Sequence, residues 1–237
     1  MRSEAKYKYG MKKVRISKYI AFTAAVLTLS LVFFGCGGAT EKYEKNISEL
    51  RDVVYTGFTE KFEVTAVSGV HEQPFAPDGS TGTKKEFTVI TVKPKEFAPN
   101  MMYGYAVTID GVARTGILTV HPFGESYSVE LDCRAKEPQL LLNIKLGNLS
   151  ENISLNTVCE DDDIDADRAL DTAISALKEE LKPLKKGGRF DCEIYVRLIA
   201  NPINADGGYY WYVAFVGENT YAALIDRKTA QVIGIKN

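Results

Sequence analysis

Few side chains in this chain of 237 residues could do chemistry. It contains two histidines, His71 and His121, each followed within a few residues by a proline. If either histidine lay beside Ser126 or Ser128, the histidine would be the base and the serine the nucleophile of acyl transfer. No Gly-x-Ser-x-Gly elbow surrounds these serines, and a catalytic triad is recognised by geometry rather than by spacing. We therefore predict that the protein is not an enzyme, and we keep an envelope hydrolase that uses one of these histidines as the less favoured alternative.

A dense acidic run offers a second set of candidate ligands. Six of the eight residues from 160 to 167 are Asp or Glu, and such carboxylates supply the oxygen ligands that Ca²⁺ prefers. In a calcium loop that begins at Asp161, the sixth position is Ala166 rather than Gly and the twelfth is Thr172 rather than Glu. Both diagnostic positions differ, so we predict a solvated linker at 159–167 that caps the next helix. We expect no metal site and no cofactor.

Four consecutive aromatic residues give the best candidate for an interaction surface. Side chains alternate along a strand, so Trp211, Val213 and Phe215 should face a core. On the other face, Tyr210 and Tyr212 should point outward. Tyr is common in protein interfaces, and we name these two tyrosines as a candidate partner-binding surface. The alternative is a Tyr-rich strand whose exposed rings have no partner.

A β-rich region precedes the acidic run. Tyr43, Ile47, Leu50 and Val54 recur at helical spacing and predict a short helix. From residue 62 onward the hydrophobic period is two, which is typical of strands. Short strands at regular spacing favour an antiparallel β-sandwich, which resembles immunoglobulin-like modules in its number of strands, and we place this domain at 43–158. The predicted strands are 62–67, 86–93, 103–110, 112–120, 126–134, 139–146 and 152–158.

One turn in that region has a distinctive sequence. Asp110-Gly111 lies between two alternating segments. A two-residue hairpin needs positive φ at both central positions, which Asp and Gly tolerate best. We therefore predict a tight hairpin here.

The region after the acidic run combines one helix with strands. An apolar stripe predicts a helix over 166–181 with Asp165 as its N-cap, and Pro183 with Gly187-Gly188 ends it. The strands that follow should form an antiparallel meander, and we place this α+β domain at 168–237. The predicted strands are 190–200, 209–216, 221–226 and 231–236.

The residues of this second region resemble a PepSY-type domain. The resemblance rests on the strand from Trp211 to Phe215, on a later strand that ends at Asp226, and on the Lys228-Thr229 turn before an apolar pair. Ala230 stands where the family prefers Gly. The resemblance covers about seventy residues and implies a non-enzymatic, extracytoplasmic module of the kind proposed to restrain peptidases. It implies no catalytic residues.

A basic, apolar leader opens the chain. Residues 1–36 carry seven Lys or Arg and one Glu, a net charge of +6. Since the whole chain has a net charge of −2, the remaining residues carry −8. The basic segment precedes a 16-residue apolar run from Tyr19 to Phe34, which is typical of a signal peptide over 1–35 and short for a membrane span. Gly35-Cys36 resembles the bacterial lipobox, which implies a lipidated Cys36 and a tether over 36–42. The alternative is an uncleaved signal anchor with an incidental cysteine.

Three further cysteines remain after the leader. Alternation places Cys133 and Cys192 on the apolar faces of strands, where free Cys acts as a small hydrophobe, and Cys159 lies in the acidic run. An odd number of cysteines without zinc-type spacing predicts no structural disulfide.

These features together predict a location and a class of function. We expect a lipoprotein on the outer face of the bacterial cytoplasmic membrane, anchored to lipid through acylated Cys36. We expect it to bind or regulate an extracytoplasmic protein or peptidase. An acidic body excludes nucleic acid as a partner. A solute- or peptide-binding lipoprotein of a transport system is the alternative, and it predicts a pocket between the two domains.

Overall fold

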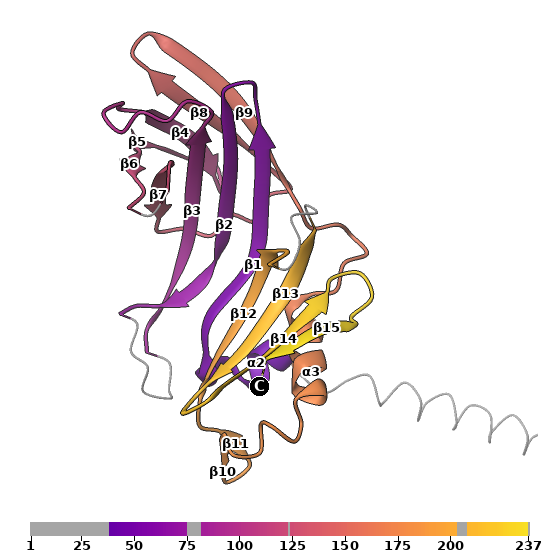
Figure 1. Cartoon of the computed structure of the whole chain (residues 1–237). Coiled ribbons are helices and arrows are strands. Elements are labelled where there is room, and N and C mark those ends of the chain that lie inside the picture. The colour runs from indigo at the N-terminus through magenta and orange to yellow at the C-terminus, as the bar shows by residue number, and fades with distance from the viewer. Residues whose placement is uncertain (1–37, 75–81, 123, 203–207, 237) are drawn as a thin grey trace, which may run out of the picture. The chain divides into compact units, whose positions relative to one another are not determined.

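The computed structural model describes residues 38–74, 82–122, 124–202 and 208–236, which belong to one compact unit, 38–237. The predicted signal peptide, 1–35, and Cys36 lie outside the described residues. The described chain is mostly antiparallel β, as expected from the sequence, with two short α-helices (Figure 1). Among these residues, neither helix has the length and apolar character to cross a membrane.

Thirteen strands form one continuous sheet. Its main path runs β15-β14-β13-β12-β1-β2-β3-β7-β6, while β9, β8, β4 and β5 continue from β1 as a second path. The strands of the sheet are β1 (Ile47–Phe58), β2 (Phe62–Glu72), β3 (Lys84–Pro94), β4 (Gly104–Ile109), β5 (Val112–Ile117), β6 (Thr119–Val120), β7 (Tyr127–Leu131), β8 (Gln139–Leu146), β9 (Leu149–Thr157), β12 (Glu193–Ala200), β13 (Tyr209–Val216), β14 (Thr220–Asp226) and β15 (Val232–Lys236). The remaining elements are α2 (Ala39–Lys42), a 3₁₀ turn (Glu44–Asn46), α3 (Ala166–Ala176) and the small hairpin β10 (Lys185–Lys186) and β11 (Arg189–Phe190).

Strand β1 joins the two predicted domains. Its first half, Ile47 to Arg51, pairs in parallel with β12, and its second half pairs with β9 at Tyr55 and Thr56. The regions predicted at 43–158 and 168–237 therefore contribute strands to one sheet. We call β2 to β9 with the second half of β1 the sandwich lobe. We call α2, α3 and β12 to β15 with the first half of β1 the helix lobe.

The helix predicted around Tyr43 to Val54 is wrong. The chain there forms α2 and a 3₁₀ turn up to Asn46 and then enters β1 at Ile47. Buried positions occur in consecutive runs along β1, and in its second half the neighbours Val54 and Tyr55 are buried on opposite faces, Val54 in the core of the helix lobe and Tyr55 in that of the sandwich lobe. A strand covered on both faces loses its period of two, and the remaining apolar spacing happened to match a helix.

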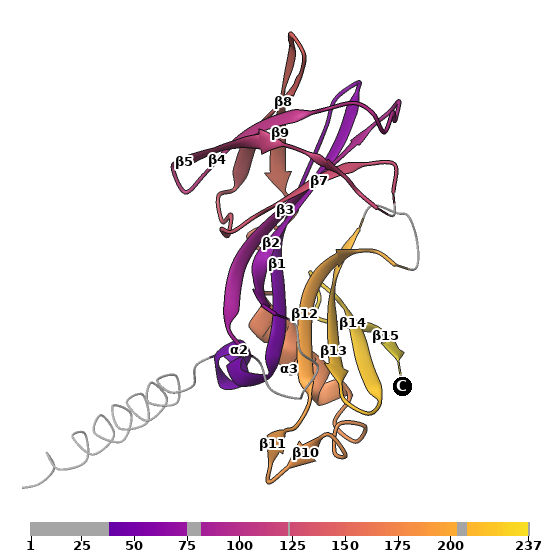
Figure 2. The same cartoon turned by 90° about the vertical axis from the view of Figure 1, so that its left-hand side faces the viewer.

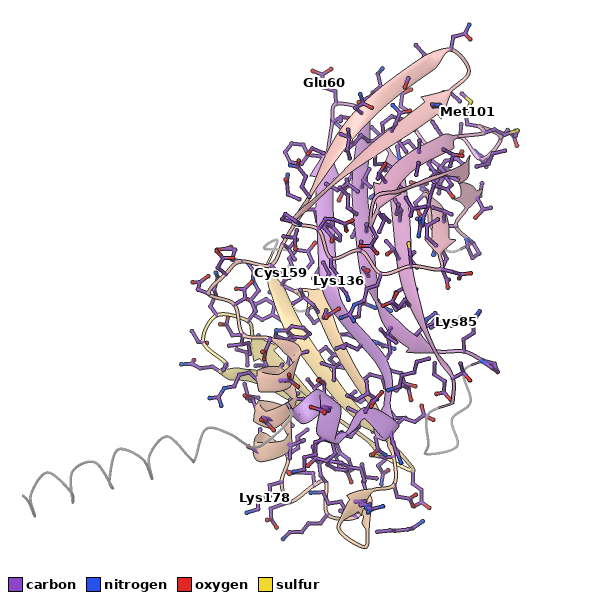
Figure 3. The ribbon with its side chains drawn as sticks, turned by 180° about the vertical axis from the view of Figure 1, so that it is seen from behind. Glu60, Lys85, Met101, Lys136, Cys159 and Lys178 are labelled. Atoms are coloured by element: carbon purple, nitrogen blue, oxygen red, sulfur yellow. The ribbon has the colours of Figure 1, made fainter. Side chains whose placement is uncertain are left out.

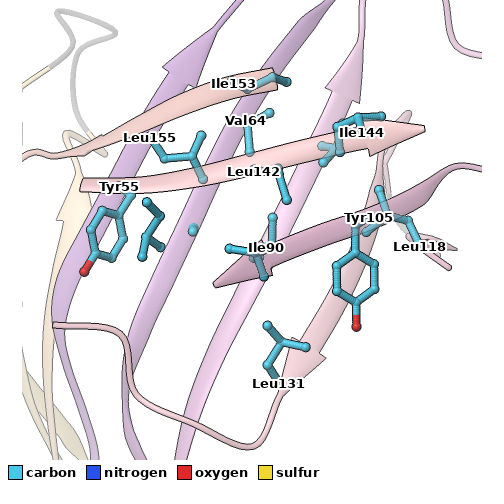
Figure 4. Packing of buried hydrophobic residues seen from close by; sticks show 14 of the residues in the cluster. Tyr55, Val64, Ile90, Tyr105, Leu118, Leu131, Leu142, Ile144, Ile153 and Leu155 are labelled. Carbon is cyan, nitrogen blue, oxygen red and sulfur yellow. The ribbon is translucent and has the colours of Figure 1, made fainter. Parts of the chain in front are cut away.

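The core of the sandwich lobe lies between two layers of strands. Strands β4, β8 and β9 cross over β1, β2 and β3, and apolar side chains fill the space between them (Figure 4). Ile90, Leu142 and Leu155 are fully buried there, and Cys133 belongs to the same core as predicted. The predicted hairpin is confirmed, with φ of 51° at Asp110 and 71° at Gly111.

The core of the helix lobe lies under α3. This helix covers one face of β12, β13 and β14 (Figure 2), and Asp165 is its N-cap, accepting a hydrogen bond from the backbone N–H of Arg168. The helix ends at Ala176 rather than 181, but Leu181 remains buried in the turn that follows. Its core includes, as predicted, Trp211, Val213, Phe215 and Cys192.

The acidic segment is held firmly by the helix lobe. Arg227, in the β14–β15 turn, donates to the Asp163 carboxylate at 2.8 Å, and its own carbonyl accepts from the N–H of Ile164 at 2.8 Å. Lys228 forms ion pairs with Glu160 and Asp162. The segment predicted as a solvated linker is thus a hydrogen-bonded connection between β9 and α3.

Candidate functional site

Strand β1 contains two β-bulges. The pairing with β12 shifts between Ile47 and Glu49, which leaves Ser48 as the extra residue. The pairing with β2 shifts between Arg51 and Val53, which leaves Asp52 as the extra residue. A bulge sets two residues against one partner and turns a side chain away from simple alternation. Each bulge in β1 lies at the wall of a cavity.

The first bulge opens onto a cavity of about 420 Å³ that we call the polar hollow. It lies on the face of the helix lobe that points away from α3, because its β13 residues alternate with those in the α3 core. Strands β13 and β14 close its far side with Tyr212 and with small or short side chains. Its polar walls are formed by Ser48, Glu49, His71, Glu72, Tyr195 and Arg197.

Two arginines neutralise the central carboxylate of the hollow. Glu49 is only 8% exposed. Arg51 Nε donates to its Oε1 at 2.8 Å, and Arg197 Nε donates to its Oε2 at 2.8 Å. The Arg197 guanidinium also stacks over the ring of Tyr195, 4.5 Å from its centroid. A buried carboxylate with both oxygens paired is held in a fixed position and has little residual attraction for a ligand.

Three other buried oxygens have no hydrogen-bond partner in the described structure: two belong to residues that line the hollow, and the third belongs to Glu193, which is not in the lining but bonds to the wall residue Tyr195. They are Ser48 Oγ, Glu72 Oε2 and Glu193 Oε1, on side chains that belong to residues 2%, 6% and 2% exposed. The second oxygen of Glu193 accepts from the Tyr195 hydroxyl at 2.8 Å, and that of Glu72 accepts from Gly82 N at 2.6 Å. Unpartnered buried acceptors are costly and therefore uncommon in native structures, so these three mark a place where a ligand could donate hydrogen bonds.

Tyr195 acts as a donor at this site. Burial, together with the hydrogen bond to the Glu193 carboxylate, raises the pKa of the Tyr195 hydroxyl above its usual value. The hydroxyl therefore stays protonated and cannot serve as a general base at neutral pH.

The two predicted tyrosines share the face of the sheet on which the hollow lies. Tyr212 lines the hollow directly. Tyr210 is half-buried and pairs with Ile199 and Asp226 farther along the same strand, away from the lining. Their placement opposite Trp211 is confirmed, and binding by these tyrosines stays a prediction.

The charged residues of the hollow were missed by the sequence reasoning. Glu49, Glu193 and Arg197 come from β1 and β12, and Glu49 and Arg197 are 148 residues apart. The available signal was the presence of Glu193 and Arg197 at alternate positions of β12, on the face opposite its apolar core residues. Each taken alone resembles an ordinary surface charge.

The two histidines lie in different surroundings. His71 lines the hollow, stacks on Phe87 at 4.5 Å, and has its Nε2 3.8 Å from the Glu130 carboxylate. His121 lies at the β6–β7 turn, where its backbone N–H donates to the carbonyl of Ser126 at 2.9 Å. The alternative of acyl transfer placed one histidine next to Ser126 or Ser128. The structure brings His121 and Ser126 together within one turn and keeps His71 with the carboxylates of the hollow.

The second bulge opens onto a cavity of about 400 Å³ that we call the junction pocket. It lies between the lobes, near Cys159 and Lys136 in Figure 3, which both line it. Asp52 lines it from β1 and forms an ion pair with Arg134, and burial raises the pKa of the Asp52 carboxyl. Burial also raises the pKa of the half-buried Cys159 thiol, which keeps the thiol protonated and a weak nucleophile.

A third cavity, of about 500 Å³, lies at the end of the sandwich lobe marked by Glu60 and Met101 in Figure 3. Nearby surface residues include large exposed apolar side chains such as Met102 and Leu149. Within the described ranges, no group of three or more His, Cys, Asp or Glu side chains is arranged to hold a metal ion.

Comparison with known proteins adds no assignment: the chain matches no family model, no curated protein and no solved structure.

Proposed function

We propose that this protein is a non-enzymatic lipoprotein of the bacterial cell envelope that binds an extracytoplasmic protein, such as a peptidase, through the polar hollow. The observation that carries the proposal is the hollow itself, where Tyr212 lies beside a fully paired Glu49 and buried oxygens without partners. Tyr rings supply contact area, and fixed charges select among partners. Tyr210, on the same face, would extend the contact.

The proposal includes an immunoglobulin-like sandwich lobe and a PepSY-like helix lobe. The order of α3 followed by the antiparallel strands β12 to β15 supports the second assignment. So does the β14–β15 turn, where one Asp226 oxygen accepts from the N–H groups of Lys228 and Thr229 and from the Thr229 hydroxyl. This geometry gives a physical reason for an Asp-x-Lys-Thr turn motif.

The lipid anchor can be tested by metabolic labelling with a palmitate analogue. We expect the wild-type chain to incorporate the label and Cys36→Ala to lose it, because two acyl chains on Cys36 would form the stable anchor. Equal labelling of both would contradict a lipidated Cys36 while leaving the binding proposal intact.

The binding function is tested by comparing two aromatic variants of the full chain, purified in detergent. Tyr212→Ala removes a ring from the hollow, and Phe58→Ala removes a ring that is 85% exposed in the sandwich lobe. An interface aromatic at the centre of a contact typically contributes enough to change affinity by tenfold or more, about 1.4 kcal/mol or above. We expect an envelope protein to be retained by wild type and Phe58→Ala and to be lost with Tyr212→Ala.

The regulatory version of this function has its own readout. Purified extracytoplasmic peptidases are assayed with the full chain present, and we expect at least one to be inhibited by wild type more strongly than by Tyr212→Ala. Absence of both retention and inhibition would remove the proposed function.

The junction pocket supports a second candidate function, a solute- or peptide-binding lipoprotein of a transport system. Its volume falls within the usual range for small-molecule sites, about 300–1,000 Å³. Trp211 lines this pocket, so ligand binding should change the fluorescence of the chain's single tryptophan and raise its unfolding temperature. A library of amino acids, short peptides and sugars that changes neither signal would argue against this second function.

A further inference from the structure

We infer that the polar hollow binds the protonated amine of a lysine side chain that a partner protein presents. The inference rests on the proposed function and names the chemical group that the hollow recognises. Its basis is the set of buried oxygens without partners, which are all able to accept hydrogen bonds.

The strand register brings these acceptors close together. In the antiparallel pairing of β1 with β2, Glu49 is opposite His71, so continuing the register by one residue sets Ser48 opposite Glu72. On the other side of β1, Ile47 is opposite Ile194, which sets Glu193 beside the start of the same strand. Neighbouring strands lie about 4.8 Å apart, so the three acceptors occupy adjacent positions on β2, β1 and β12.

The bulge in β1 explains why Ser48 takes part. Strict alternation would point Ser48 and Glu49 to opposite faces, but both line the hollow. The bulge between Ile47 and Glu49 turns both side chains toward the same cavity. Ser48 is 2% exposed and its hydroxyl has no partner, so this side chain is turned into a buried site without any bond that would stabilise the fold.

Unpartnered carboxylate oxygens, rather than a net charge, favour a cation at the hollow. Three carboxylates belong to it or adjoin it, but the two guanidinium groups of Arg51 and Arg197 both bind Glu49. Lys84, opposite Glu72 on β3, donates its hydrogen bond to the backbone carbonyl of Glu44, although its charge also acts on the Glu72 carboxylate. The other two carboxylates each keep one unpartnered oxygen, which would repel an anionic ligand and attract a donor.

The geometry favours an ammonium over a guanidinium group. Each open acceptor is a single oxygen on a different strand, which suits the three rotatable donors of an ammonium, whereas a guanidinium fork suits two oxygens of one carboxylate. A volume of about 420 Å³ accommodates one long side chain. Tyr212 provides an aromatic wall for the aliphatic stem and for cation–π attraction.

The test uses three capped pentapeptides that differ only at the central residue: lysine, Nε-acetyl-lysine and norleucine. Binding to the full chain in detergent is measured by fluorescence anisotropy of a labelled peptide. We expect the lysine peptide to bind at least about tenfold more tightly than the other two, since hydrogen bonds to charged groups are the stronger class. Equal binding of the lysine and norleucine peptides would overturn the inference, and so would tighter binding of a peptide with a central glutamate.

Three variants and a matched control locate the effect. Ser48→Ala, Glu72→Gln and Glu193→Gln each remove or weaken one acceptor, while Glu63→Gln makes the same charge change at an exposed position of β2. We expect weaker lysine-peptide binding for the three variants, by about tenfold for the glutamate changes, and unchanged binding for Glu63→Gln. If Glu72→Gln and Glu193→Gln each bound the lysine peptide as tightly as the wild-type chain, the inference would be overturned.

The outcomes separate this inference from the proposed function. If an envelope protein is retained through Tyr212 but the lysine peptide does not bind, the binding function stands and the lysine inference is wrong. If free spermidine competes with the labelled lysine peptide and the retained envelope protein does not, the hollow is a site for small amines, and the inference of a protein lysine is wrong.

Discussion

The sandwich lobe and the helix lobe share β1, and each contains a buried serine, but the two serines differ in their hydrogen bonding. In the sandwich lobe, Ser68 is fully buried and its hydroxyl contacts the Phe87 carbonyl, the Thr88 hydroxyl and the N–H of Ala135. In the helix lobe, Ser48 is also buried, and its hydroxyl has no partner. Since a fold gains nothing from an unpartnered buried hydroxyl, the difference separates polar groups that hold the structure from those available to a ligand.

The layering of the two lobes explains this difference. The strands of the sandwich lobe face a second layer of strands, so the space between them is filled mainly by apolar side chains (Figure 4), and buried polar groups such as Ser68 are hydrogen-bonded there. The sheet of the helix lobe has α3 on one face, and the opposite face carries the polar hollow. A sheet face that has no second layer is where side chains remain accessible to a partner, and this is where the paired charges of Glu49 gather.

The largest expected effect tests whether the two lobes are one cooperative unit. Leu142→Ala in the sandwich lobe and Leu170→Ala in the helix lobe each empty a fully buried site, so each should lower the free energy of unfolding by about 2–5 kcal/mol. Because β1 belongs to both cores, we expect Leu142→Ala to shift the urea transition of Trp211 fluorescence as much as that of far-UV circular dichroism.

The single tryptophan makes this test selective. Trp211 lies in the core of the helix lobe, where its Nε1 donates to the Ile164 carbonyl at 3.0 Å. If Leu142→Ala moves the circular dichroism transition and leaves the Trp211 transition in place, the lobes unfold separately, and the two-domain interpretation of the sequence would be the better one.

The next effect compares the two buried serines. Ser68→Ala removes a hydroxyl that satisfies several neighbours and should lower the free energy of unfolding by about 1–3 kcal/mol. Ser48→Ala removes a hydroxyl without partners, so it should leave stability unchanged or raise it. Urea unfolding of both variants measures the difference. A loss in Ser48→Ala as large as that in Ser68→Ala would show that Ser48 has a structural role.

The sequence predicted the elements that depend on local chemistry. The Asp110-Gly111 hairpin, the Asp165 cap and the ends of β8 and β13 follow from turn residues and from a period of two or 3.6. Strand β1 was predicted wrongly because burial on both faces erased its alternation. The sheet that the two predicted domains share across 159–167 could not be predicted, because pairing between β1 and β12 is non-local.

The candidate site was only partly within reach of the sequence. Tyr212 was identified because alternation within one strand places it on the face opposite the core residue Trp211. The acceptors around it come from three strands and from a bulge at Ser48. A bulge shifts the alternation by one residue, but it can be assigned only against the partner strand, and long-range register cannot be derived from one sequence, so these residues needed coordinates.

A smaller effect concerns the turns of the two lobes. Gly111 in the sandwich lobe and Ala230 in the helix lobe both have positive φ, 71° and 59°. L-residues with a Cβ are strained there, so Ala230→Gly should raise the free energy of unfolding by about 0.5 kcal/mol and Gly111→Ala should lower it by about 1 kcal/mol. An added Cβ at Gly111 has no atom within 4 Å, so the second effect reports conformation alone. Destabilisation by Ala230→Gly would show that the strain at Ala230 is negligible.

The smallest effect comes from the acidic segment of the helix lobe and depends on pH. Hydrogen bonds from Lys228 lower the pKa values of Glu160 and Asp162. The stabilisation is therefore fully present above the unfolded pKa values, about 4, and is lost as pH falls through the lower folded values. Lys228→Gln should reduce the melting temperature slightly at pH 7, and the difference from wild type should shrink toward pH 3 and in high salt, since all these groups are exposed.

Lys178→Gln, an exposed lysine change in the same lobe, serves as the control. A difference for Lys228→Gln that stays constant from pH 7 to about pH 3 would mean that the ion pairs do not anchor the acidic segment, and its attachment would then depend on Ile164 and Asp163 with Arg227.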